Sequence, residues 1–183
     1  MNVGTTARLS LDWLTPDDAQ FILTLVNDPQ WLAFIGDKGV RTLEDARNYL
    51  RTGPLDMYDR LGFGLYRVSR RALYTPEEQP IGICGLVRRE GLADVDLGFA
   101  FLPMGRGRGY ALEAAQAVLA HGFDDLGLPR IVAITLPHNR SACQLLDRLG
   151  MTPHGAVRVP ADGPDKLLFA IENRRGGAGR VRR

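Results

Sequence analysis

The sequence has few cysteines, no long apolar run and no histidine cluster. Its two cysteines, Cys84 and Cys143, lie far apart in the chain, so we expect reduced thiols rather than a disulfide. No apolar stretch approaches membrane-spanning length, and the N-terminus lacks the apolar core of a signal peptide. His121 and His154 have no partners at metal-ligand spacing, so no metal site is expected. These absences predict a cytoplasmic protein without a membrane partner.

Positive charge is scarce in the body of the chain. Residues 174–183 contain five arginines and no acid, and without these five the 23 basic residues fall to 18 against 21 acidic ones. An acidic body argues against nucleic acid as a partner. The basic tail has too little apolar content to fold, and we expect it to be disordered. The remaining residues, 1–173, are predicted to form one domain.

Hydrophobic periodicity and turn residues indicate how the chain is organised. Strands are predicted at 9–13, 63–74, 81–88, 94–102, 131–136, 153–159 and 167–171. A turn at 75–80 joins the second and third of these into a hairpin. Helices are predicted to begin after Thr15 and end at 27–29, to begin after Thr42 and end at Gly53, and to follow Gly109 and Asn139. This order predicts a mixed α/β sheet with helices on both faces.

The most informative stretch is 94–123, where a predicted strand leads through a glycine-rich turn into a helix. Gly105, Gly107 and Gly109 occur in the turn, and the helix begins at Tyr110. Glycine lets backbone N–H groups converge on an anion at a helix N-terminus, which predicts a phosphate site. A dinucleotide fold would need another glycine in place of Tyr110, and a P-loop would need a lysine, which this stretch lacks.

Three motifs carry a resemblance to a known family. Residues 106–111, Arg-Gly-Arg-Gly-Tyr-Ala, are similar to the Arg/Gln-x-x-Gly-x-Gly/Ala acyl-CoA motif of the GNAT N-acetyltransferases. The strand, turn and helix around them resemble the ribosomal-protein-alanine acetyltransferase branch, the RimJ/RimL-like enzymes. Asn139 and Ser141 at a helix start, and residues 145–151 at its end, are similar to two further patterns of that branch. The resemblance covers residues 6–171.

The resemblance implies a mostly antiparallel sheet of six or seven strands, with a splay between the fourth and fifth, at 94–102 and 131–136. Acetyl-CoA would be the acyl donor, with its pantetheine arm pairing with the first of these strands. The implied cofactor-binding residues are Phe99, Ala100, Phe101, Arg106, Gly107, Arg108, Gly109, Tyr110, Ala111, Asn139 and Ser141. Backbone N–H groups would provide most of the pyrophosphate binding, with Arg106 or Arg108 adding charge.

In the family, an amine attacks the thioester directly. Asp96 is the candidate general base, although it could equally be an acid at a strand start that pairs with an arginine. Many relatives have a tyrosine in the last helix as proton donor, but Leu146 stands at that position. Ser141 is the substitute implied by the branch, with Asn139 orienting the ligand. The alternative for both is that they only cap the helix.

The acceptor is less clearly indicated. Neutralising a lysine at pH 7 costs roughly 4–5 kcal/mol, whereas an α-amino group costs about 1 kcal/mol, so a weakly basic site suits a protein N-terminus. A small-molecule amine, or a catalytically weak acyl-CoA-binding module, is the alternative. Trp31 and Phe34 are candidate substrate contacts, unless they only pack a connector onto the core. The sequence leaves open whether the protein forms a homodimer.

Overall fold

The computed structural model describes residues 1–71 and 78–173. The predicted tail and most of the predicted 75–80 turn lie outside this range. The helices within it are α1 (Ala19–Val26), α2 (Pro29–Phe34), α3 (Leu43–Leu50), α4 (Asp56–Leu61), α5 (Tyr110–Ala120) and α6 (Arg140–Arg148). The strands are β1 (Asn2–Thr5), β2 (Leu9–Trp13), β3 (Leu65–Arg70), β4 (Gln79–Val87), β5 (Val95–Phe101), β6 (Arg130–Thr135), β7 (Thr152–Arg158) and β8 (Asp165–Glu172).

The strands of the described residues form one sheet in the order β1-β2-β3-β4-β5-β6-β8-β7. All neighbours are antiparallel except β5 and β6, which are parallel. The mixed, mostly antiparallel α/β sheet is therefore confirmed. It has eight strands rather than six or seven because β1, too short to show a pattern in the sequence, pairs with β2.

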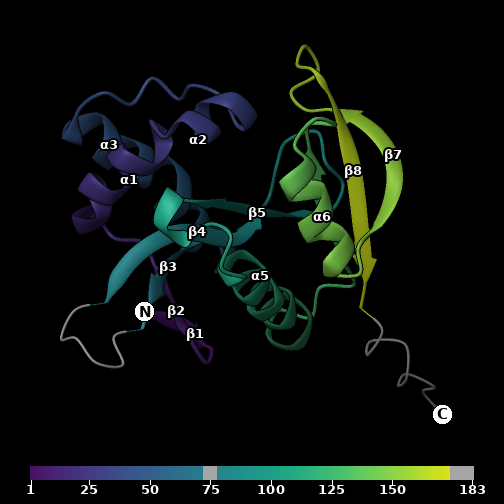
Figure 1. Ribbon diagram of the computed structural model, residues 1–183, viewed down its shortest axis with the longest axis horizontal. Helices are drawn as coiled ribbons and strands as arrows, with labels where there is room; N and C mark the ends of the chain where they lie inside the picture. Colours follow the sequence, from purple (N-terminus) through teal and green to yellow (C-terminus); the bar gives the residue numbers. More distant parts are fainter. Residues whose placement is uncertain (72–77, 174–183) are drawn as a thin grey trace.

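Helices cover both faces of the sheet (Figure 1). On one face, side chains such as Leu86 and Leu97 share a core with Ala114 of α5 and Leu146 of α6. On the other face, Ile83 of β4 belongs to a second core that includes residues of α1, α2 and α3. Because side chains alternate along a strand, these two cores assign each sheet residue to a face. Figure 1 shows β7 and β8 on the far side of α6 from β4 and β5.

Local capping signals explain several helix starts. Thr42 and Asp45 form a reciprocal capping box at the start of α3, as the sequence predicts. Thr15 begins a short 3-10 turn that leads into α1. Asp28, predicted as part of a stop signal, also caps α2 by accepting a hydrogen bond from the Gln30 N–H at 2.9 Å. The same residues therefore end one helix and begin the next.

The predicted end of the second helix at Gly53 was wrong. The chain continues through a π-helical turn, Arg51–Leu55, into α4, and the helical segment ends only at Gly62, which has a φ of +75°. The wider π turn accommodates Pro54 without ending the helical segment. Cys84 and Cys143 are free thiols, as expected. No helix in the described part of the chain is long and apolar enough to cross a bilayer.

Candidate active site

The turn between β5 and α5 presents unpaired backbone donors. Gly107 and Gly109 have φ of +70° and +77°, a region that L side chains rarely adopt, and Gly109 is the N-cap of α5. No acceptor among the described residues bonds the backbone N–H groups from Gly107 to Ala111. The dipole of α5 favours negative charge at this end. The turn therefore has the donors and the field of an anion site.

The two arginines of this turn have different partners. Arg106 forms an ion pair with Asp28, a buried carboxylate, and so fastens the turn to the start of α2. Its charge is already offset by Asp28. Arg108 is exposed and has no ion pair in the described part of the chain. Of the two predicted phosphate contacts, Arg108 is the one whose charge is available.

The N-terminal segment holds the start of α5 in place through hydrogen bonds. Glu113 accepts hydrogen bonds from the Thr6 hydroxyl at 2.5 Å and from Arg8 Nε at 2.7 Å. Arg8 also donates to the backbone oxygen of Arg108 at 3.0 Å, and its guanidinium lies 4.5 Å from the centre of the Tyr110 ring. Sequence reasoning missed Arg8 because its partner Glu113 lies 105 positions away. Arg8 thus helps to position the turn.

Glu113→Gln should destabilise the fold in a pH-dependent way. Burial by itself would raise the pKa of Glu113, but hydrogen bonds from Thr6 and Arg8 hold it below its ordinary value of 4.5. A lowered folded pKa adds stability above the unfolded pKa, and this stability is lost as pH falls through the folded pKa. We expect a loss of roughly 1–2 kcal/mol at pH 7, measured by urea denaturation, that shrinks toward about pH 3. An equal loss at both pH values would contradict this role of the charge.

β5 and β6 separate soon after they meet. They pair at only two residues each, up to Asp96 and Val132. β5 nevertheless stays paired with β4 as far as Phe101, and β6 stays paired with β8 as far as Thr135. The facing edges of β5 and β6 beyond Asp96 and Val132 therefore have no strand partner in the described part of the chain. The predicted splay is confirmed, and an open edge of this kind can pair with an extended ligand.

The residues predicted to pair with pantetheine lie on this open stretch of β5. Phe99 is half-buried against the α5 core, Ala100 packs on the α1–α3 side, and Phe101 is buried. Their side chains are thus committed to the two cores. This leaves the backbone edge as the available surface, in agreement with recognition through main-chain groups.

Asp96 lies buried where the two strands separate. Its Oδ2 accepts a hydrogen bond from Arg89 Nε at 2.6 Å, and its Oδ1 is buried without a partner in the described residues. Burial raises the pKa of Asp96, and the charge and hydrogen bond of Arg89 oppose this. The backbone N–H of Ile134 and the charge of Lys166 also favour the charged form. The predicted arginine pairing is present, and the role as base stays a prediction.

The start of α6 is a capped turn. Asn139 Oδ1 accepts hydrogen bonds from the Ala142 N–H at 3.2 Å and from the Ser141 hydroxyl at 2.9 Å. The capping role of Asn139 is confirmed, whereas the ligand contacts of Asn139 and Ser141 stay predictions. Leu146 is only 1% exposed and packs in the core beside α5, so this position supplies no proton donor.

The two aromatic residues predicted to contact the acceptor lie in different surroundings. Trp31 is buried, and its indole N–H donates to the Gly36 oxygen at 3.1 Å, so it packs the α2 segment onto the core as the alternative reading proposed. Phe34 is half-buried at the end of α2, and its ring centre lies 5.8 Å from that of His138 in the loop after β6. Phe34 is therefore the candidate that lies near the end of β6.

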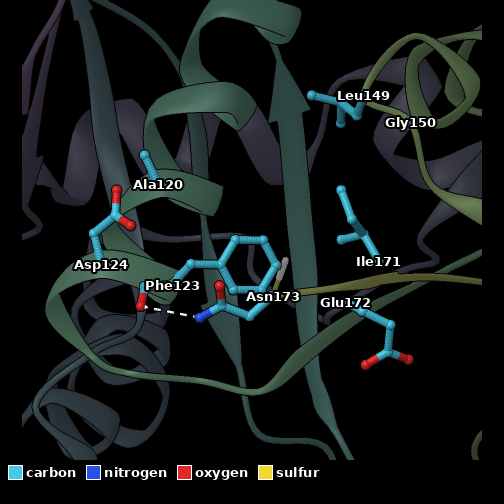
Figure 2. A pocket seen from close by; sticks show the side chains of 8 residues that line it. All are labelled: Ala120, Phe123, Asp124, Leu149, Gly150, Ile171, Glu172 and Asn173. Atoms are coloured by element: carbon cyan, nitrogen blue, oxygen red, sulfur yellow. Dashed lines mark hydrogen bonds between the residues drawn. The ribbon is translucent and has the colours of Figure 1, made fainter. Parts of the chain in front are cut away.

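A separate, mostly apolar hollow of about 320 Å³ lies at the other end of α5. Figure 2 shows its lining, in which the Asn173 amide donates to the Phe123 oxygen at 3.3 Å. Glu172 on its rim pairs in register with Arg130, at the start of β6, whereas the open edge begins after Val132. The hollow therefore lies away from the splay and contains none of the predicted site residues. Its lining residues are Ala120, Phe123, Asp124, Leu149, Gly150, Ile171, Glu172 and Asn173.

The chain is similar to the proteins of one known family. The sequence profile of the acetyltransferase (GNAT) domain matches residues 8–152. The chain belongs to the GNAT family. It is an acyl-CoA-dependent acetyltransferase, and the resemblance inferred from its three motifs is confirmed.

Sequence relatives of this GNAT protein occur in Bacillus subtilis. The uncharacterised N-acetyltransferase YnaD is 28% identical over 171 residues, which cover 91% of this chain and 95% of YnaD. The uncharacterised N-acetyltransferase YoaA is 26% identical over 155 residues, covering 84% of each chain. These matches span nearly the full length of both proteins and agree with acetyl transfer to nitrogen.

Solved structures show the same fold. A GNAT-family acetyltransferase from Bacillus anthracis superposes with a TM-score of 0.75 at 24% identity, covering 96% of this chain and all of that one. RimL, a ribosomal alpha-N-protein acetyltransferase solved in complex with coenzyme A, superposes with a TM-score of 0.73 at 15% identity, covering 94% of this chain and 98% of RimL. At these identities the likeness establishes the fold alone.

Proposed function

We propose that this GNAT enzyme transfers the acetyl group of acetyl-CoA directly to a primary amine, and that the amine is the N-terminal α-amino group of a protein. One observation carries the proposal. The open edge of β5 begins after Asp96, and the same segment of chain then leads into the unpaired N–H groups from Gly107 to Ala111. RimL, which shares the fold, is named as an acetyltransferase of protein α-amines.

The residues present fit the donor. The unpaired N–H groups of the turn would bind its pyrophosphate, with Arg108 adding positive charge. The open edge from Phe99 to Phe101 would pair with the extended pantetheine arm. A backbone N–H on that edge would polarise the thioester carbonyl as negative charge develops on its oxygen.

Two side chains would carry out the proton transfers, and a third would position one of them. Asp96 would take the proton of the amine, directly or through water, as the N–C bond forms and the C–S bond breaks. Ser141 would donate a proton to the departing thiolate and regain one from solvent, and Asn139, which accepts the Ser141 hydrogen bond at 2.9 Å, would position that hydroxyl. Asp96 is a weak base, and an α-amino group needs only about 1 kcal/mol for deprotonation at pH 7, against roughly 4–5 kcal/mol for lysine.

Thiol release from acetyl-CoA tests this function. We expect release with peptides that have a free N-terminus and none with N-terminally blocked peptides that contain a lysine side chain. Release with small amines but with no peptide would show that the acceptor is a small molecule and not a protein N-terminus. If no amine in the panel releases thiol while coenzyme A binds tightly by calorimetry, the transfer reaction itself is refuted.

A further inference from the structure

The 183-residue chain has two lysines, Lys38 and Lys166; the charge of Asp96 acts on Lys166, and so does the charge of Lys38. On β8, Leu167 and Phe169 pack in the core beside α5, so alternation places Lys166 on the opposite face of the sheet. Asp96 also lies on that face, because its neighbours Val95 and Leu97 belong to the α5 core. The glycine-rich turn after β5 leads into α5, whereas Asp96 and Lys166 lie on the α1–α3 side of the sheet. An acceptor would thus approach the open edge from this second side.

Two turns bring Arg89 and Lys166 to the same rim. Lys166 Nζ donates to the backbone oxygen of Val159 at 2.6 Å, in the connection between β7 and β8. The buried Val159 side chain lies 3.7 Å from the Cβ position at Gly91, two residues after Arg89 in the β4–β5 turn. Burial lowers the pKa of Lys166, and the charges of Arg89 and Lys38 lower it further. Arg89 and Lys38 therefore both lie within electrostatic reach of Lys166.

The charges of this cluster are not balanced by its one carboxylate. Arg89 uses Nε for Asp96, and its terminal nitrogens have no hydrogen-bond partner among residues 1–71 and 78–173. Asp96 Oδ1 is buried and has no hydrogen-bond partner among the described residues. An unpaired carboxylate oxygen therefore lies beside the unpaired terminal nitrogens of Arg89. Tyr49 of α3 adjoins them: burial raises the pKa of its hydroxyl, and the Arg89 charge lowers it. A buried oxygen such as Asp96 Oδ1 is costly to leave unpaired.

We propose that this face is the acceptor site and that it selects an amine with a carboxylate within a few bonds of the reacting nitrogen. The proposal rests on the acetyl transfer proposed above. The amine would be held at Asp96 Oδ1, and the carboxylate at Arg89 and Lys166, with Lys38 adding charge. The carboxylate has two sources: an acidic side chain next to a protein N-terminus, or the α-carboxylate of a free amino acid.

Two matched pairs of acceptors separate these sources. The first pair is a C-terminally amidated peptide beginning Ala-Glu and the same peptide beginning Ala-Gln; the second is alanine and alaninamide. KM is measured from thiol release, and Kd by calorimetry on the enzyme with coenzyme A bound. We expect the carboxylate-bearing member of at least one pair to have a KM and Kd about tenfold lower than its neutral partner. A preference in the first pair identifies the side chain, and one in the second identifies the α-carboxylate.

Variants connect the preference to the cluster. Lys166→Gln should abolish the preference, and Lys38→Gln, on an exposed loop, should weaken it if the Lys166 variant fails to fold. Arg158→Gln is the matched control, because Arg158 pairs with Asp165 at 2.5 Å and alternation places this pair on the other face of the same hairpin. Equal Kd and KM within both wild-type pairs would overturn the inference while leaving acetyl transfer intact. A preference that survives in Lys166→Gln and Lys38→Gln would overturn it as well, and the binding measurements decide the matter even without turnover.

Discussion

Gly109→Val is expected to abolish coenzyme A binding, raising the Kd at least about a hundredfold. Gly109 has a φ of +77°, where a β-branched residue is strained by roughly 1–3 kcal/mol. A Cβ at this position would lie in ordinary contact with Arg8 Nη2, at 3.5 Å, and the two methyl groups of valine would extend further from the backbone. The turn would shift, and its N–H groups would no longer converge on the pyrophosphate. Calorimetry with coenzyme A measures the effect directly.

Gly127→Val is the matched control for this substitution. Gly127 also has a positive φ, +65°, and no atom lies within 4 Å of its Cβ position. It precedes β6 and follows α5, whereas the glycine-rich turn lies at the start of α5. Both variants should lose a similar amount of unfolding free energy, but only Gly109→Val should lose coenzyme A. If the two bind coenzyme A equally well, the turn is not the pyrophosphate site.

Asp96→Asn is expected to lower kcat about a hundredfold with little change in the Kd for coenzyme A. Asparagine keeps the size of the side chain but cannot accept the amine proton. Burial raises the pKa of Asp96, so the wild-type rate should rise with pH as the carboxyl ionises at a pH above its ordinary pKa of 3.8. The variant should lack this rise. Initial rates of thiol release across the pH range measure both effects.

Asp94→Asn is the control for Asp96. Asp94 lies two residues earlier on the same side of the chain, and its carboxylate is 3.6 Å from Arg130. A folded pKa above the unfolded one means that ionising Asp96 costs stability as pH rises between the two values, so removing its charge should not unfold the enzyme at pH 7. Equal turnover of the two variants at every pH would refute the role of Asp96 as base, and its pairing with Arg89 would then be purely structural.

Local signals in the sequence identified the elements of the site. The capping box at Thr42, the N-cap at Asn139 and the positive-φ glycines of the donor turn all depend on neighbours within a few residues. Such signals are short-range because a cap or a turn satisfies its own backbone groups. Their failures were local as well: Gly53 and Pro54 read as a helix end, but a π turn carries the chain past them into α4.

The partners of the charged residues did not follow from local signals. Arg106 and Asp28 are 78 positions apart, and nothing in either segment indicated that the arginine predicted for phosphate would be neutralised by a helix cap. Trp31 was a candidate for substrate contact until the packing of α1, α2 and α3 placed it in the core. These pairings depend on how the layers of the fold are placed, which spacing along the chain does not report.

By itself, the sequence determined the order of the main elements, the glycine turn that is predicted to bind an anion and the family to which those motifs belong, because each depends on contacts within one turn or one strand. Only the tertiary structure decided where β5 and β6 separate, that Arg8 holds the turn, and that Lys166 lies within electrostatic reach of Arg89. Ion pairs and open edges form where distant segments pack together. The glycine turn could therefore be predicted from the sequence, whereas the charged cluster of Arg89, Asp96 and Lys166 could be recognised only in the fold.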